Sequence, residues 1–190
     1  MARDTTRRLI LLRHAKSDWP DVPDRERPLA KRGRRDAPRI GRWLHEHGYQ
    51  PDVVVVSAAA RTQQTWDLVA PQLGGSPAIR FEPRAYAASA LTLLYLAQEL
   101  PARYRTALLI AHNPGLSELA ASLAAPPESD GATGSPESDR AAGSATTNNS
   151  PRPAISLPTA AVAVFEFSGD WPSLTPGQAR LTDHIIPADL

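Results

Sequence analysis

Four runs of apolar residues divide the chain, and each is typical of a strand that is buried on both faces. Strands covered by helices on both sides read as continuous apolar runs, whereas half-exposed strands alternate with polar residues. The four runs are Leu9–Leu12, Val53–Val56, Ala107–Ala111 and Ala160–Phe167. Two weaker runs, Ala78–Phe81 and Leu181–Ile186, predict two more strands.

Between these runs, apolar residues recur at the three- and four-residue spacing of a helix. Ala37, Ile40 and Leu44 follow this spacing, and Gly48 supplies a stop signal at the end of that helix. Pro38 indicates that the regular helix begins shortly before it or bends there. Three further helices are predicted at Arg61–Leu73, at Ser89–Leu100 with Ser89 as the N-cap, and at Gly115–Leu123.

Strands and helices alternate through most of the chain, and this order is typical of α/β proteins. It predicts a three-layer α/β/α sandwich with a mostly parallel central sheet flanked by helices. A chain of 190 residues suits one domain of ordinary size, so residues 1–190 are interpreted as a single domain. Residues 126–153 contain no large apolar side chain and cannot bury enough surface to offset their ordering entropy. They predict a disordered insertion within that domain.

The composition argues against several classes of partner. The chain has 21 Lys and Arg residues and 20 Asp and Glu residues, which gives a net charge of +1. This balance does not indicate binding to nucleic acid or to an anionic membrane. Cysteine is absent, which excludes disulfides, thiolate chemistry and zinc–thiolate sites. The first apolar run is too short for a signal peptide or a membrane span. We therefore expect a cytoplasmic protein.

Basic side chains follow three of the predicted strands at the point where each strand ends. In open α/β sheets, ligands bind outside the carboxyl ends of the strands. The residues brought to that edge are two arginines and two histidines: Arg13, His14, Arg61 and His112. This combination predicts an anion site that contains a nucleophile.

Phosphoryl transfer needs these residue types. Arginine pairs bidentately with phosphate oxygens, and histidine, with a free pKa of about 6.5, offers a nitrogen lone pair near neutral pH. A second histidine, when protonated, can donate to the phosphoryl oxygens. The helix predicted to begin at Gly115 directs its N-terminus to the same edge, where free backbone N–H groups favour an anion, and glycine lets backbone approach closely. No metal or cofactor is expected.

Several motifs in the chain resemble those of the histidine phosphatase superfamily, and they occur in the same order. They are Leu-Leu-Arg-His-Ala at 11–15, Arg27-Pro28-Leu29 followed by Arg32-Gly33, Ser57 followed by Arg61-Thr62 and Gln64-Thr65, and Ala-His-Asn-Pro-Gly at 111–115. Arg-His-Ala-Lys-Ser at 13–17 and Leu-Pro-Thr-Ala-Ala-Val at 157–162 are similar to the SixA-like branch, the phosphohistidine phosphatases. The resemblance covers nearly the whole chain outside the insertion.

This resemblance implies a role for each motif residue. His14 is expected to be the nucleophile and to form a phosphohistidine intermediate. The residues expected to form the phosphate pocket with it are Arg13, Arg61 and His112. Ser17 and Asn113 are expected to add neutral hydrogen bonds to the substrate.

The chain departs from the superfamily at the general acid. Many members supply a carboxylic acid after the third strand, but Ala87 follows Tyr86 where a glutamate often stands. Glu82 comes too early and is expected on the surface. Asp18 and Asp24, in the loop after the nucleophile, are solvated aspartates by default and alternative proton donors.

The missing acid favours one class of substrate. A phosphate monoester expels an alkoxide, which leaves poorly unless it is protonated, whereas a phosphohistidine expels an imidazole that titrates near neutrality. The predicted partner is therefore a phosphorylated protein, for example a histidine phosphotransfer domain. The alternatives are a small-molecule phosphomonoesterase acting on a phosphorylated metabolite, and a phosphoprotein-binding module without turnover.

Overall fold

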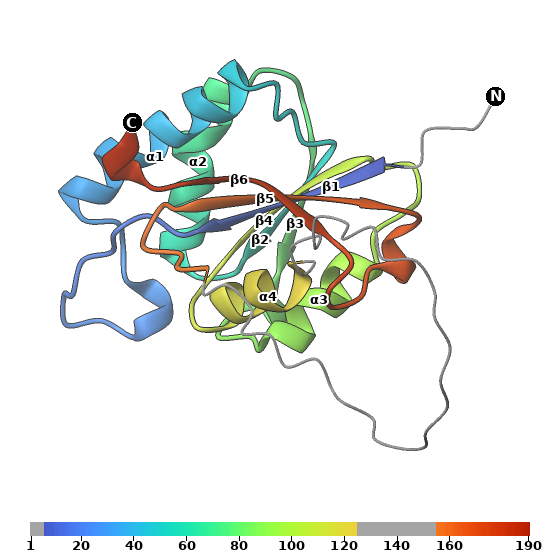
Figure 1. The fold of residues 1–190 in the computed structure, drawn as a ribbon. Helices are drawn as coiled ribbons and strands as arrows, with labels where there is room; N and C mark the ends of the chain where they lie inside the picture. The colour runs from blue at the N-terminus through green and yellow to red at the C-terminus, as the bar shows by residue number, and fades with distance from the viewer. Residues whose placement is uncertain (1–5, 125–154) are drawn as a thin grey trace, which may run out of the picture.

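The computed structural model describes residues 6–124 and 155–190, so the insertion predicted at 126–153 lies outside the described residues (Figure 1). The strands are β1 (Thr6–Arg13), β2 (Val53–Ser57), β3 (Ala78–Glu82), β4 (Thr106–Ala111), β5 (Val162–Ser168) and β6 (Arg180–Ile185). The helices are α1 (Lys31–Glu46), α2 (Ala60–Leu73), α3 (Ala90–Gln98) and α4 (Gly115–Leu123). Short 3-10 turns are η1 (Asp24–Glu26), η2 (Pro83–Ala85), η3 (Trp171–Ser173) and η4 (Pro187–Asp189).

The strands form one sheet in the order β3-β2-β4-β1-β5-β6. The pairings of β3 with β2, β2 with β4 and β4 with β1 are parallel, whereas β5 is antiparallel to both β1 and β6. Only β5, among the strands described, therefore runs against the others. The predicted mostly parallel sheet is confirmed, although an apolar run carries no signal for the direction of its strand.

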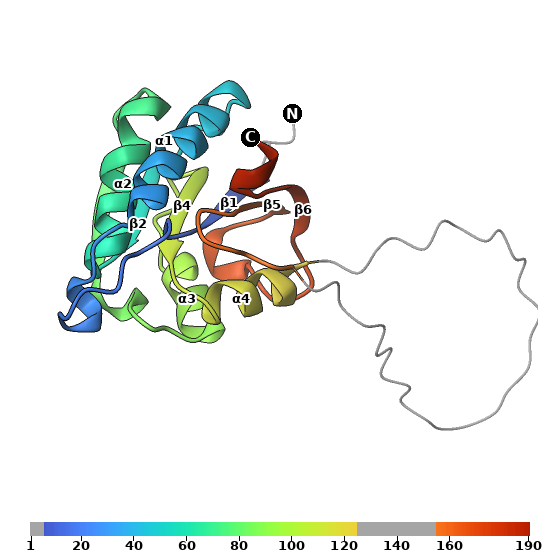
Figure 2. The ribbon, with the colours of Figure 1, turned by 90° about the vertical axis from the view of Figure 1, so that its left-hand side faces the viewer.

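Helices cover both faces of the sheet. In Figure 1, α1 and α2 lie above the sheet and α3 and α4 below it, and the view in Figure 2 shows the same layers. Successive residues of β1 point to opposite cores: Leu9 and Leu11 pack with α3 and α4, whereas Ile10 and Leu12 pack with α1 and α2. All four side chains are at most 1% exposed, and each such burial contributes about 1.5–3 kcal/mol. The three-layer α/β/α sandwich is thus confirmed.

Two element boundaries differ from the sequence prediction. Helix α1 begins at Lys31 and runs through Pro38 rather than starting just before it. Proline removes the hydrogen bond to the carbonyl of Arg34, but Arg34 is exposed to water, and the apolar face of the helix is buried against the sheet. Strand β5 begins at Val162 instead of Ala160, because Ala160 has a φ of +62°, which does not fit a strand.

The first turn of α4 approaches the backbone of another segment closely. A Cβ atom at Gly115 would lie 2.1 Å from the carbonyl oxygen of Ala88. The sequence predicted close backbone approach at this glycine, and the structure shows that the neighbour is the protein's own chain before α3. Gly115 thereby sets the position of the segment that carries His112.

Replacing Gly115 by alanine is expected to destabilise the fold by about 1–3 kcal/mol, because two backbone segments must separate to admit the methyl group. Urea unfolding monitored by tryptophan fluorescence measures this loss. Glu118→Ala, at an exposed position of the same helix, is the control and is expected to change stability by less than about 0.5 kcal/mol. Equal stability of the two variants would contradict the close packing at Gly115.

Candidate active site

The carboxyl ends of β1, β2 and β4 meet at one edge of the sheet. Arg13 is the last residue of β1, and His14 follows it directly. Arg61 lies in the first turn of α2, and His112 follows β4. The ring centroids of His14 and His112 are 5.2 Å apart, and the charges of Arg13 and Arg61 act on both imidazoles. The structure therefore brings the four predicted residues together.

His14 is held in one tautomer and kept neutral. Its Nδ1 lies 2.8 Å from the carbonyl oxygen of Ala15. Because a carbonyl only accepts, Nδ1 carries the proton and Nε2 carries the lone pair. Burial, aided by the positive charges of Arg61 and Arg13, lowers the pKa of His14 to about 4 although the Ala15 bond opposes the shift. At neutral pH, Nε2 of His14 therefore carries an available lone pair.

The depressed pKa gives a direct expectation for a titration. Burial disfavours the imidazolium, so His14 is expected to gain its proton only as the pH falls through about 4. NMR of the ring protons, assigned by comparison with His14→Gln, measures the midpoint. A midpoint near the ordinary histidine value of about 6.5 would contradict this electrostatic description of the site.

His112 is buried beside His14 and is bound to a serine. Its Nε2 lies 2.7 Å from Oγ of Ser57, the last residue of β2, and its Nδ1 is buried with no hydrogen-bond partner among the described residues. Burial, with the nearby His14 and Arg61, lowers the pKa of His112 to about 3. The sequence interpretation assigned no role to Ser57, although it ends an apolar run beside the predicted site.

Arg27 is a further basic residue of the site that the sequence did not assign. It is 6% exposed, and its Nη2 donates to Oγ of Ser17 at 2.9 Å. Its Nη1 donates to Oδ1 of Asp24 at 2.8 Å, and the ring centroid of Trp19 lies 3.2 Å from its guanidinium carbon. The Arg27-Pro28-Leu29 motif was the available signal. Ser17, predicted to bind substrate, thus lies beside a buried guanidinium.

Asp24 forms hydrogen bonds with Arg27 in the loop and with Arg61 in α2, and so links the two side chains. Its Oδ2 accepts from Nη2 of Arg61 at 3.0 Å and from the hydroxyl of Tyr86 at 2.7 Å, and its backbone carbonyl accepts from Nη1 of Arg61 at 2.7 Å. Hydrogen bonds from Tyr86, Arg27 and Arg61 hold the pKa of Asp24 well below its usual range. Its carboxylate is therefore ionised at neutral pH and has no proton to give to a leaving group.

The other predicted polar residues of the site have their own partners. Asp18 lies in the loop and accepts from the backbone N–H of Trp19 at 2.9 Å. Asn113 donates from Nδ2 to the carbonyl of Leu157 at 2.9 Å and accepts from Oγ of Ser117 at 3.0 Å. Arg13 donates to the same Leu157 carbonyl at 3.1 Å, so the two side chains share one acceptor. The Nε of Arg13 is buried and has no partner among the described residues.

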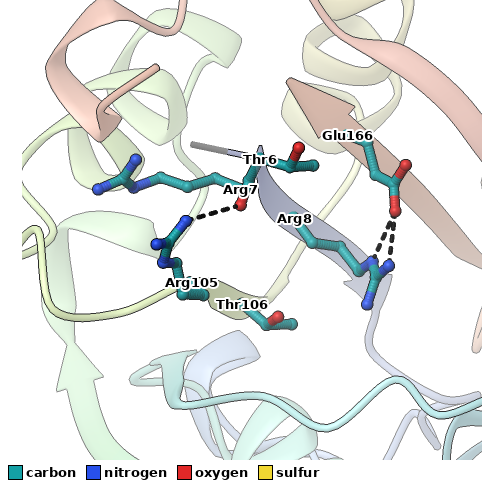
Figure 3. Close-up of a pocket in the computed structure, with 6 residues that line it drawn as sticks. All are labelled: Thr6, Arg7, Arg8, Arg105, Thr106 and Glu166. Atoms are coloured by element: carbon teal, nitrogen blue, oxygen red, sulfur yellow. Dashed lines mark hydrogen bonds and ion pairs between the residues drawn. The ribbon is translucent and has the colours of Figure 1, made fainter. Parts of the chain in front are cut away.

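A separate hollow of about 250 Å³ lies at the other end of β1 (Figure 3). It is lined by Thr6, Arg7, Arg8, Arg105, Thr106 and Glu166. Arg8 pairs with Glu166 at 2.5 Å, and Arg105 donates to the carbonyl of Thr6 at 3.5 Å. Since Thr6 and Thr106 begin their strands, this hollow is at the amino ends of β1 and β4, away from the four candidate residues.

Comparison with known proteins assigns the family. The family model of the histidine phosphatase superfamily (branch 1) matches residues 9–85, which include the Arg13-His14 and Arg61 motifs. Protein Rv1276c of Mycobacterium tuberculosis is 31% identical over 177 residues, which are 93% of this chain and 99% of that protein. The chain belongs to the histidine phosphatase superfamily. It is accordingly an enzyme with phosphatase activity.

Solved structures place this histidine phosphatase near SixA proteins. The proposed phosphohistidine phosphatase SixA from Nakamurella multipartitia is 27% identical, covers 96% of both chains and superposes with a TM-score of 0.76. The mycobacterial glucosyl-3-phosphoglycerate phosphatase Rv2419c has the same fold, with 17% identity, coverage of 93% of this chain and 97% of that chain, and a TM-score of 0.61. The chain is therefore SixA-like, and its fold also occurs in a phosphatase of a phosphorylated sugar derivative.

The region where many histidine phosphatases carry their acid is built differently here. Ala87 offers only a methyl group, and the preceding Tyr86 directs its hydroxyl to Asp24. The expectation that Glu82 lies on the surface is wrong, because Glu82 is only 5% exposed. It accepts from the backbone N–H and the guanidinium of Arg84 at 3.0 Å each, and these bonds lower its pKa to about 2. Glu82 is therefore an ionised structural residue.

The described residues form neither a metal-binding cluster nor a membrane-spanning helix. In residues 6–124 and 155–190, no group of three or more His, Cys, Asp or Glu side chains is arranged to hold a metal ion. None of the helices in this described part of the chain is long and apolar enough to cross a membrane.

Proposed function

We propose that this histidine phosphatase transfers the phosphoryl group of phosphohistidine on a protein to Nε2 of His14 and then to water. The observation that carries the proposal is the 2.8 Å contact of His14 Nδ1 with the Ala15 carbonyl, which leaves Nε2 as the lone-pair nitrogen. A nucleophile that is already deprotonated needs no general base.

The reaction has two displacement steps. In the first, the lone pair of His14 Nε2 attacks phosphorus while the bond from phosphorus to the substrate nitrogen breaks, and that nitrogen keeps the electron pair. In the second step, water attacks phosphorus while the bond from phosphorus to Nε2 breaks, and Nε2 regains its lone pair. The proton that the water gives up stays on the inorganic phosphate that is released. Arg13 and Arg61 neutralise the phosphoryl oxygens in both steps. Ser17, which is bonded to Arg27, and Asn113, which follows His112, are assigned to neutral contacts with the substrate.

The protonation states favour phosphohistidine as the substrate. Asp24, the carboxylate that pairs with Arg61 and Arg27, is kept ionised by its hydrogen bonds from Tyr86 and Arg27. Without a protonated acid, an alkoxide would leave slowly, whereas an imidazole takes its proton from solvent near neutral pH. The structure thus suits a phosphoramidate better than an alkyl phosphate.

An exposed aromatic residue at the site suits a protein substrate. Trp19 is 75% exposed and stacks on Arg27, whose other contacts, Ser17 and Asp24, lie in the site. Tryptophan is enriched at the energetic centres of protein interfaces. Its ring therefore offers a protein substrate a contact next to the reacting phosphoryl group.

Phosphate release from a panel of substrates tests the proposal. The panel contains a phosphohistidine-bearing phosphotransfer domain and small phosphomonoesters, with His14→Ala and the exposed-site variant His184→Ala as controls. We expect the protein substrate to be preferred in kcat/KM. Preference for a small ester would instead make the enzyme a metabolite phosphatase, and binding without turnover on every substrate would support a phosphoprotein-binding module.

A series of aryl phosphates tests the missing acid separately. If no group protonates the leaving oxygen, kcat/KM is expected to fall steeply as the pKa of the leaving phenol rises. A shallow dependence would show that a proton donor is present, and Asp24→Asn and Asp18→Asn would then identify it by steepening the dependence.

A further inference from the structure

Ser57 is buried in the site and its hydroxyl hydrogen-bonds to His112. It ends β2, is 0% exposed, and its Oγ lies 2.7 Å from Nε2 of His112. Within the described part of the chain, this is the hydroxyl's one hydrogen bond. Either direction leaves one buried proton unpaired in the free enzyme, at a cost of about 1–3 kcal/mol: the hydroxyl proton if Ser57 accepts, or the Nδ1 proton of His112 if Ser57 donates. Only the second arrangement puts that proton on the imidazole beside His14, where a transferred phosphoryl group can accept it. The hydroxyl is therefore assigned as the donor to Nε2.

This direction of the hydrogen bond determines the tautomer of His112. Since the pKa of His112 is lowered to about 3, the ring is neutral at pH 7 and carries one proton. With Nε2 accepting from Ser57, that proton is on Nδ1. The same Nδ1 is buried and lacks a partner among the described residues.

No acceptor among the described residues lies within hydrogen-bond distance of the buried N–H of His112, although the Tyr86 ring contacts the imidazole edge-on at 5.6 Å and the charge of Asp24 acts on it. The guanidinium groups of Arg13 and Arg61, whose charges act on His112, are donors only. The ring of His14, with its centroid 5.2 Å away, presents the nitrogen that would carry the phosphoryl group. An oxygen of that phosphoryl group is the acceptor chemistry that fits this N–H.

We propose that Ser57 is a positioning residue that holds His112 in the Nδ1–H tautomer, so that this N–H meets the phosphoryl group transferred to His14. The inference rests on the proposed function of His14. A hydroxyl suits the task because it can also rotate and accept from Nε2–H when phosphoryl charge favours the imidazolium of His112. The methyl group of an alanine at position 57 can neither donate to Nε2 of His112 nor accept from it.

The tautomer is measurable in the free enzyme, with no substrate. Nitrogen-15 NMR of histidine-labelled protein distinguishes protonated from lone-pair nitrogens, and His112→Gln assigns the signals. We expect a protonated Nδ1 in the native protein and a shift toward Nε2–H in Ser57→Ala. The signals of His14, whose Nδ1 contacts Ala15, are expected to stay unchanged and to report that the site is folded.

Kinetics on an aryl phosphate complete the test. Ser57→Ala is expected to lower kcat/KM by about tenfold or more, equivalent to one hydrogen bond, and Ser57→Thr is expected to restore most of it. A native His112 with its proton on Nε2, or an unchanged tautomer in Ser57→Ala, would overturn the inference. If Ser57→Ala does not fold, the native spectrum alone decides the tautomer. If the proposed phosphatase function is wrong, the substrate panel will show it. The NMR measurement uses no substrate, so it tests the tautomer of His112 independently of that result.

Discussion

Replacing His14 by alanine is expected to lower kcat by at least about 10⁴-fold, the scale seen when a covalent nucleophile is removed. The variant keeps Arg13 and Arg61, which are proposed to bind phosphate, but loses the lone-pair nitrogen that the Ala15 hydrogen bond defines. Substrate binding should therefore survive while turnover does not. Stopped assays of phosphate release, with binding followed separately by calorimetry, measure both quantities.

The control for this variant is His184→Ala. His184 is exposed and contacts the carbonyl of Ser156, so its loss should leave kcat within about twofold of the native value. If His14→Ala retained native turnover, covalent catalysis at His14 would be wrong. If the native protein and His14→Ala bound a phosphoprotein equally and neither turned it over, a binding module would be the better account.

The second large effect is expected at Arg61. Its Nη1 and Nη2 both contact Asp24, at 2.7 and 3.0 Å, so the guanidinium is held in one orientation by its fork of donors. Lysine keeps the charge but cannot reproduce that fork or a bidentate contact with phosphate. Arg61→Lys is expected to lower kcat/KM by about 10²–10³-fold, as for the loss of a preorganised transition-state contact.

Arg103→Lys is the matched control for Arg61→Lys. Arg103 is exposed and donates to the hydroxyl of Tyr104, away from the carboxyl ends of the strands. Steady-state kinetics on one aryl phosphate should separate the two variants by at least about tenfold. An Arg61→Lys enzyme as active as Arg103→Lys would mean that only positive charge, and not its geometry, is required at Arg61.

The layers of the fold and the centre of the site were accessible from local pattern. Continuous apolar runs such as Leu9–Leu12 identify strands that are buried on both faces. In the structure, consecutive residues of this run pack alternately into the hydrophobic cores on the two sides of the sheet, which confirms the prediction. Residues that directly follow such runs, as His14 and His112 do, must lie at the carboxyl edge of a parallel sheet. The gathering of these side chains is therefore a consequence of topology and needs no long-range information.

The remaining features depend on contacts between distant segments. In the sequence, Arg27 stands out only as part of a motif, because its burial against Ser17 and Asp24 depends on how the loop folds. Glu82 looked exposed because its burial depends on Arg84 and on the edge of the sheet. The hydrogen bond from the Tyr86 hydroxyl that helps to keep Asp24 ionised joins two residues 62 positions apart in the chain. No local pattern encodes such pairings.

Trapping the phosphorylated enzyme tests the central claim most directly. The native protein is mixed with a phosphohistidine-bearing protein or an aryl phosphate, quenched in alkali within milliseconds, digested and analysed by mass spectrometry. The account predicts one phosphoryl group on the peptide that contains His14, attached at Nε2, and none in His14→Ala. Turnover without any phosphorylated His14, or with the phosphoryl group on His112, would contradict it.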